Sequence, residues 1–81
     1  EFAILLSGTS TGDAGILAER IRQAIAAARF RLDGSRVSVT VSFGLAQFRA
    51  SDSNYEDALK RADDALYRSK AEGRNTIRIL D

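Results

Sequence analysis

The sequence contains no cysteine and no histidine. It therefore lacks the residues for a disulfide framework, a zinc finger, a thiol nucleophile or an imidazole base. The groups that remain for chemistry are carboxylates, lysines, arginines, hydroxyls and the backbone itself. Any functional site in this chain has to be built from those groups.

An excess of charge of one sign is also absent. Twelve basic and eleven acidic side chains give a formal net charge of +1, so the whole chain creates no field that would attract nucleic acid or an anionic membrane. No apolar run approaches the length needed to cross a bilayer, and 44% apolar with 28% charged residues is ordinary for a soluble globular chain. We therefore expect no nucleic-acid partner and no direct membrane contact, and any anion must bind locally.

The length of 81 residues allows one domain at most, and a core of this size only marginally outweighs the entropy of ordering the chain. The chain begins at Glu1 without methionine and opens directly on an apolar run that does not have the pattern of a signal peptide or transit segment. We therefore expect residues 1–81 to be a fragment of a larger domain.

The first third of the chain predicts a strand and then a helix. Residues 2–6 form a short apolar run that suits a buried strand, and a loop rich in serine, threonine and glycine follows. From Asp13 to about Arg29 the apolar positions fall on one face of a helix, at Ala14, Leu17, Ala18, Ile21, Ala24, Ile25 and Ala28. This pattern predicts an amphipathic helix.

The strongest strand signal lies in residues 37–46, where apolar and small or polar side chains alternate. Gly44 interrupts this pattern, which indicates either a bulge or a point where another backbone or a ligand comes close. An Asp33-Gly34 turn precedes the strand.

A second helical stripe, with Ser53 and Glu56 as a capping box at its start, is expected to end at Gly73. Residues 75–80 supply a last short strand. The order of elements is strand, helix, long strand or hairpin, helix and strand. It predicts an α/β layer domain, an α+β sandwich in which helices cover a sheet.

Three stretches together resemble the GGDEF family. Glu1-Phe2 looks like the last two letters of the family's Gly-Gly-Asp/Glu-Glu-Phe signature. The Val-Thr-Val-Ser-Phe-Gly-Leu-Ala segment that begins at Val39 is similar to the family's Val-Thr-Val-Ser-Ile-Gly-Val-Ala strand. The segment from Arg61 to Asn75 closely follows the family's Ala-Asp-x-Ala-Leu-Tyr-x-Ala-Lys-x-x-Gly-Arg-Asn helix. The chain is therefore identified as the C-terminal half of a GGDEF domain, truncated on the N-terminal side of a nucleotidyl-cyclase-like sheet.

The resemblance implies a diguanylate cyclase, a nucleotidyltransferase that condenses two GTP into cyclic di-GMP in bacterial second-messenger signalling. It further implies a homodimer in which each domain supplies one nucleotide, Mg²⁺ in the intact domain, and a cytoplasmic location. The signature glycines, a metal-binding Asp and the guanine-contacting residues of the family have no counterpart from Glu1 onward. We therefore expect this chain alone to be inactive. The alternative is a degenerate GGDEF module that binds GTP or cyclic di-GMP without catalysis.

The resemblance assigns the terminal phosphates of GTP to Lys70 and Arg74. Four residues apart in a helix, the two cations would stand on one side and converge on one anion, whereas spacing alone favours two solvated cations that offset a helix end. Glu1 matches the fourth signature position, so the resemblance implies a catalytic and metal-binding carboxylate there. One carboxylate without partner acids makes a poor Mg²⁺ site, and we expect no cofactor on this chain alone.

Arg20 matches a position from which some family members contact cyclic di-GMP at an inhibitory site. The residues alone favour a solvated arginine that pairs with Glu19 or Asp13. The charged residues of the second helix are interpreted as a surface pattern, with a structural role for Asp63. Core packing is expected for the aromatic residues Phe43, Phe48, Tyr55 and Tyr67.

Overall fold

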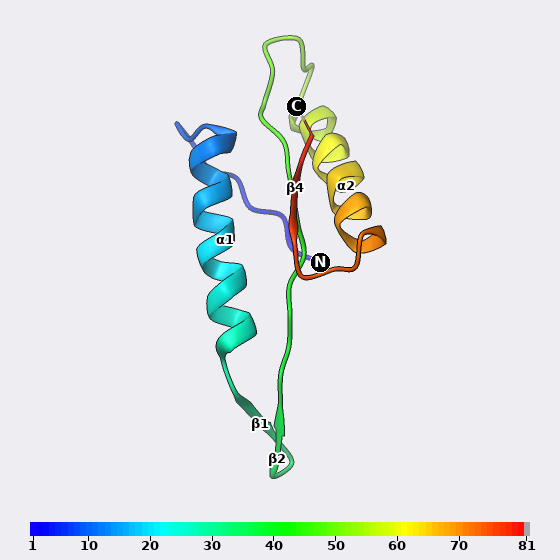
Figure 1. The fold of residues 1–81 in the computed structure, drawn as a ribbon. Helices are drawn as coiled ribbons and strands as arrows, with labels where there is room; N and C mark the ends of the chain where they lie inside the picture. Colours follow the sequence, from blue (N-terminus) through cyan, green and yellow to red (C-terminus); the bar gives the residue numbers. More distant parts are fainter. Residues whose placement is uncertain (81) are drawn as a thin grey trace.

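The structure is a computed structural model that describes residues 1–80, so Asp81, the last residue of the predicted domain, lies outside the described residues. Two helices and four short strands follow one another along the chain (Figure 1): α1 (Thr11–Ala27), β1 (Phe30–Leu32), β2 (Ser35–Val37), β3 (Phe43–Leu45), α2 (Tyr55–Ala71) and β4 (Ile77–Ile79). The prediction of an α+β class is confirmed.

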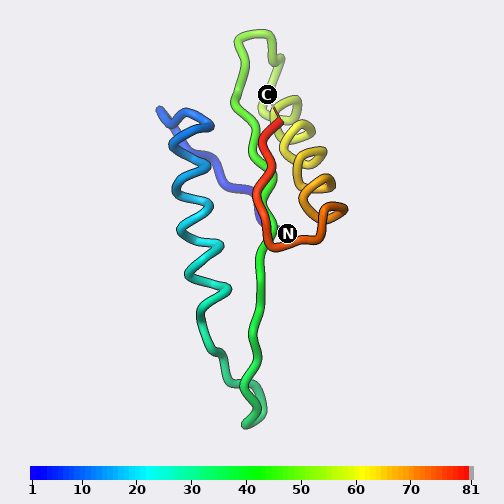
Figure 2. Tube along the Cα trace, viewed as in Figure 1, coloured from blue at the N-terminus to red at the C-terminus, as the bar shows by residue number. Residues whose placement is uncertain are grey.

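The centre of the fold is a β3-α2-β4 unit. β3 and β4 are parallel, with Gly44 opposite Arg78, and α2 is the crossover that parallel strands require. The two strands run between α1 and α2, and both helices contact both strands (Figure 1). The antiparallel hairpin of β1 and β2 extends away from this unit at one end of the molecule (Figure 2).

Gly44 lies directly against the backbone of α2. A Cβ atom built on Gly44 would lie 2.1 Å from the carbonyl oxygen of Ala62 and 2.3 Å from the amide nitrogen of Leu66. Ala65, on the same part of α2, is 1% exposed. Of the interpretations left open for Gly44, the structure therefore shows the close approach of another backbone, and that backbone belongs to α2.

The strand predicted for residues 37–46 is interrupted. Its first residue, Val37, belongs to β2 and Phe43–Leu45 form β3, while residues 38–42 and Ala46 are not in a strand. The pairing of β2 with β1 ends at Val37, which lies opposite Phe30, and the pairing of β3 with β4 begins at Phe43, which lies opposite Ile77. The alternating pattern thus extends further than the neighbouring strands do.

The strand predicted for residues 2–6 is wrong for this structure. The segment pairs with no other strand among the described residues, and Phe2 is 98% and Leu5 81% exposed. Apolar residues predict a strand, but a strand also needs a neighbour to which its backbone can hydrogen bond.

The helix starts differ from the prediction by one or two residues. α1 begins at Thr11 because the Ser10 side chain accepts a hydrogen bond from the amide of Asp13. At α2 the expected capping box is wrong: Asn54 is the N-cap and its side chain accepts from the amide of Glu56. In each helix, the side chain of the residue directly before the first turn accepts a hydrogen bond from a backbone amide of that turn.

Arg61, interpreted from the sequence as part of a surface charge pattern, instead forms a largely buried ion pair. Its Nη1 and Nη2 donate to the two carboxylate oxygens of Asp52 at 2.7 and 2.8 Å, and Nη2 also donates to the carbonyl of Gln47. The Asp52 side chain is only 4% exposed. The bidentate pair therefore fastens the loop before α2 to the helix itself.

This ion pair predicts loss of stability in acid. The hydrogen bonds from Arg61, and next that from the Arg49 amide, lower the pKa of Asp52 from 3.8 to about 2, so the folded state favours the ionised carboxylate. The stabilisation is complete above pH 4 and is lost as the pH falls from about 4 to about 2. In urea titrations at pH 2 to 5, Asp52→Asn is expected to lower the unfolding midpoint at pH 5 and to leave a weaker dependence on pH.

Asp64→Asn is the matched control, because Asp64 is exposed on α2 and makes no hydrogen bond or ion pair with the described residues. It should retain the acid sensitivity of the parent chain. An Asp52→Asn chain that lost stability in acid as steeply as the parent would contradict the role of this pair.

Candidate functional site

The end of α2 sets the positions of the two predicted phosphate-binding cations. Gly73 has a φ of 113°, and its amide donates to the carbonyl of Lys70 while the amide of Arg74 donates to that of Ser69. This is the Schellman arrangement, so the prediction that Gly73 ends the helix is confirmed. Arg74 consequently lies beyond the helix with a φ of 64°, and the expectation that it stands on a helix face with Lys70 is wrong.

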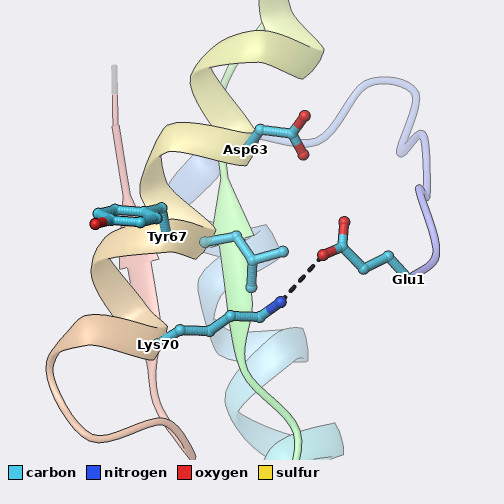
Figure 3. A pocket seen from close by; sticks show the side chains of 5 residues that line it. Glu1, Asp63, Tyr67 and Lys70 are labelled. Carbon is cyan, nitrogen blue, oxygen red and sulfur yellow. Dashed lines mark hydrogen bonds and ion pairs between the residues drawn. The ribbon is translucent and has the colours of Figure 1, made fainter.

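Lys70 and Arg74 nevertheless line the same depression. The depression has a volume of about 330 Å³, and its walls are Tyr67, Lys70, Ala71 and Arg74. A second depression of about 270 Å³ is lined by Glu1, Asp63, Leu66, Tyr67 and Lys70 (Figure 3). Lys70 and Tyr67 belong to both, so Lys70 stands between Arg74 on one side and the two carboxylates on the other.

Glu1 is the partner of Lys70 in this structure. The Lys70 ammonium donates to the Glu1 carboxylate at 3.0 Å (Figure 3). The hydrogen bond and charge of Lys70 lower the pKa of Glu1. The predicted catalytic carboxylate and the predicted phosphate-binding cation thus meet although 69 residues separate them. An incoming phosphate would have to compete with Glu1 for this ammonium group.

The described residues do not fit a complete metal site. Residues 1–80 contain no cluster of three or more acidic side chains that could hold an ion, and Mg²⁺ binds through several oxygen ligands. Glu1 and Asp63 line one depression, but the Glu1 carboxylate is engaged by Lys70. Asp63 is exposed and makes no hydrogen bond with the described residues, so the structural role expected for it is not seen.

Arg20, the predicted inhibitory-site residue, lies exposed on α1, away from the lining of both depressions. The expected pairing of Arg20 with Glu19 is wrong. The Glu19 carboxylate is bound by Arg22 at 2.6 Å and by Gln23 at 2.8 Å, and its pKa falls to about 2, chiefly through the Arg22 hydrogen bond. Within residues 1–80 the guanidinium of Arg20 makes no ion pair and is accessible.

The core positions expected for three of the aromatic residues are wrong. Tyr67 is 75% exposed, Tyr55 65% and Phe48 51%. Helix α2 buries Ala65 and Ser69 against the sheet instead. Tyr67 is four residues from the end of α2, on a side of the helix that borders both depressions.

Sequence reasoning missed the contacts that hold the loop around Arg74. The Asn75 side-chain oxygen accepts from Arg22 at 2.9 Å, and the Asn75 amide donates to the Ser42 hydroxyl at 3.0 Å. The only local signal was the three-residue spacing of Glu19 and Arg22. The other contacts join residues 33 and 53 positions apart, and no periodicity indicates them.

No helix within residues 1–80 is both long and apolar enough to cross a membrane.

Comparison with known proteins gives a consistent result. The profile of the family described as "Diguanylate cyclase, GGDEF domain" matches residues 1–76. The chain is 35% identical to diguanylate cyclase A of Treponema denticola, over 98% of this chain and 21% of the relative. It is 40% identical to diguanylate cyclase DgcP of Pseudomonas aeruginosa, over 98% of this chain and 12% of the relative.

A solved structure carries the same fold. The structure of the active GGEEF domain of a diguanylate cyclase from Vibrio cholerae superimposes with a TM-score of 0.79 at 32% identity. The match covers 94% of this chain and 47% of the solved chain. The chain therefore spans about half of that solved domain and between 12 and 21% of the two relatives above.

Proposed function

The chain belongs to the GGDEF domain family, and from this premise we propose that it forms part of a domain that condenses two GTP into cyclic di-GMP. Within that domain its role is to bind the terminal phosphates of one GTP through Lys70 and Arg74. The main observation in support of this proposal is that both cations line one depression at the end of α2. Two cations beside one depression suit a polyphosphate, because each forms charge-assisted hydrogen bonds to phosphate oxygens.

The rest of the proposed reaction requires a second domain, a metal ion and acidic ligands in addition to residues 1–80. Condensation joins the nucleotides of two domains, so we propose a homodimer that works in the cytoplasm, where GTP is available. Mg²⁺ is proposed for the intact domain, with Glu1 as one ligand. Residues 1–80 offer too few acidic ligands for that ion, and we propose that this chain alone binds phosphate without turning over GTP.

The second candidate is a regulatory module that binds GTP or cyclic di-GMP and does not catalyse. The exposed guanidinium of Arg20 favours it, because a planar set of donors without an intramolecular ion pair suits phosphates and guanine edges. A cyclic di-GMP titration of the parent chain and of Arg20→Ala separates the two candidates. The regulatory hypothesis would be favoured if the parent chain bound cyclic di-GMP, if Arg20→Ala abolished this binding, and if no product formed from GTP.

The proposed phosphate contacts predict the behaviour of a double variant. Titration of the chain with Mg-GTP in a calorimeter should show binding, and Lys70→Ala/Arg74→Ala should weaken it at least about 100-fold, because two charge-assisted contacts are lost. A chromatographic assay for cyclic di-GMP on the same samples is expected to find no product.

Arg31→Ala/Arg36→Ala is the matched control. These arginines are paired across the β1-β2 hairpin and are both exposed. The variant therefore also removes two positive charges, but far from the depression. It should bind Mg-GTP as the parent chain does. If the two double variants weakened binding equally, a general charge effect would replace the proposed site, and cyclic di-GMP from the parent chain would overturn the expected inactivity.

A further inference from the structure

The loop that carries Arg74 has a backbone that ordinary residues rarely adopt. Gly73, Arg74 and Asn75 have consecutive φ values of 113°, 64° and 49°. Glycine tolerates the left-handed region without steric cost and asparagine visits it more often than most residues, whereas arginine rarely does. Such a conformation persists where several surrounding contacts determine it together.

Three segments of the chain supply those contacts. From α2, the Ser69 carbonyl accepts from the amide of Arg74 at 3.0 Å. From the segment before β3, the Ser42 hydroxyl accepts from the amide of Asn75 at 3.0 Å. From α1, Arg22 donates to the Asn75 side chain at 2.9 Å. Arg22 is therefore the one link from α1 to this loop among the hydrogen bonds of the described residues.

Arg22 is itself held in place. Its Nε and Nη2 donate to the two oxygens of Glu19 at 2.8 and 2.6 Å. This fork leaves Nη1 to face Asn75. The Arg22 side chain is only 19% exposed, and Gln23 donates to the same Glu19 carboxylate. The Arg22–Glu19 pair carries no net charge, so the effect expected from Arg22 on an anion at Arg74 is mainly that of positioning the loop.

We propose that Arg22 is a positioning residue for the phosphate site: it fixes Asn75, and through Asn75 the direction in which Arg74 leaves the loop. This inference rests on the proposed function of Arg74. A cation whose backbone is already fixed loses less conformational freedom on binding, so the same contact gives higher affinity. Removing Arg22 should free the loop while every phosphate-contacting side chain stays in the chain.

The test combines a structural and a binding measurement on the whole chain. Backbone NMR couplings and Cα shifts of Arg74 and Asn75 report their left-handed conformation, and Arg22→Ala should shift both toward averaged values. Titration with inorganic tripolyphosphate should show about fivefold weaker binding for Arg22→Ala and about tenfold for Arg74→Ala. Arg22→Ala/Arg74→Ala should bind no more weakly than Arg74→Ala, because Arg22 acts through Arg74.

The outcomes separate this inference from the proposed function. Unchanged NMR parameters at Arg74 and Asn75 in Arg22→Ala would overturn the inference, and so would additive losses in the double variant. If Arg74→Ala bound tripolyphosphate as the parent chain does, the proposed phosphate site would fail, whatever the NMR showed. Arg31→Ala, which removes one exposed charge from the hairpin, should leave both measurements unchanged.

Discussion

Gly44→Ala is expected to lower the free energy of unfolding by about 3 kcal/mol or more. The added Cβ would meet three backbone atoms of α2 at 2.1 to 2.8 Å. Backbone atoms cannot move aside as a flexible side chain can, so α2 as a whole has to shift away from β3. The whole stability of a domain of this size is about 4 to 12 kcal/mol, so this one methyl group removes a large part of it.

Thermal unfolding followed by circular dichroism should show the effect as a midpoint lowered by more than about 10 °C. Gly12→Ala is the control, because a Cβ there would lie 3.8 Å from the Ser10 hydroxyl and meets no backbone. Gly12 is in the first turn of α1, where alanine favours the helix, so this variant should be as stable as the parent or slightly more so. Equal stability of both variants would show that α2 does not pack on β3 as closely as described.

The features that the sequence predicted well are those with a local cause. The apolar stripe of α2 and the glycine after it predicted a helix that ends at Gly73, because the 3.6-residue period and the left-handed cap are properties of consecutive residues. Gly44 marked either a bulge or a close approach, because a glycine in an alternating strand fits both, and the structure shows the close approach. The β3-α2-β4 unit follows from these signals together.

The features that failed depend on partners distant in the sequence. Residues 2–6 have the composition of a strand but no neighbouring strand in the described chain, and composition cannot supply one. Arg61 looked like a surface charge because Asp52, nine residues earlier, gave no sign of turning back toward it. Tyr67 was assigned to the core by its apolar ring, although the neighbouring small residues of α2 are the ones that allow close packing.

The candidate site likewise has residues that could be predicted from the sequence and contacts that could not. The resemblance named Lys70 and Arg74, and the structure places both beside one depression, although not on one helix face. Their contacts with GTP stay predictions. The network of Arg22, Asn75 and Ser42 could not be predicted, because it brings together three segments whose proximity is fixed only when the helices pack on the strands.

Ser69→Leu is expected to be as severe as Gly44→Ala, for a different reason. Ser69 is fully buried between α2 and the sheet, at 0% exposure, and its hydroxyl donates to the carbonyl of Thr76 at 2.8 Å. Leucine is larger and has no donor, so the substitution both overfills the interface and removes a hydrogen bond. Together these effects should cost about 3 kcal/mol, seen as a lower urea midpoint.

The matched variant Ser69→Ala separates the two effects. It removes the hydroxyl without adding volume, and the Thr76 carbonyl still accepts from the amide of Phe43, so a loss of only about 1 kcal/mol is expected. The Ser69 carbonyl also accepts from the amide of Arg74, so a helix displaced by leucine must move the loop that carries this cation. Tripolyphosphate affinity should therefore fall in Ser69→Leu, measured where the variant is still folded, and hold in Ser69→Ala. Equal affinity in the two variants would mean that the packing of α2 and the direction of Arg74 are independent.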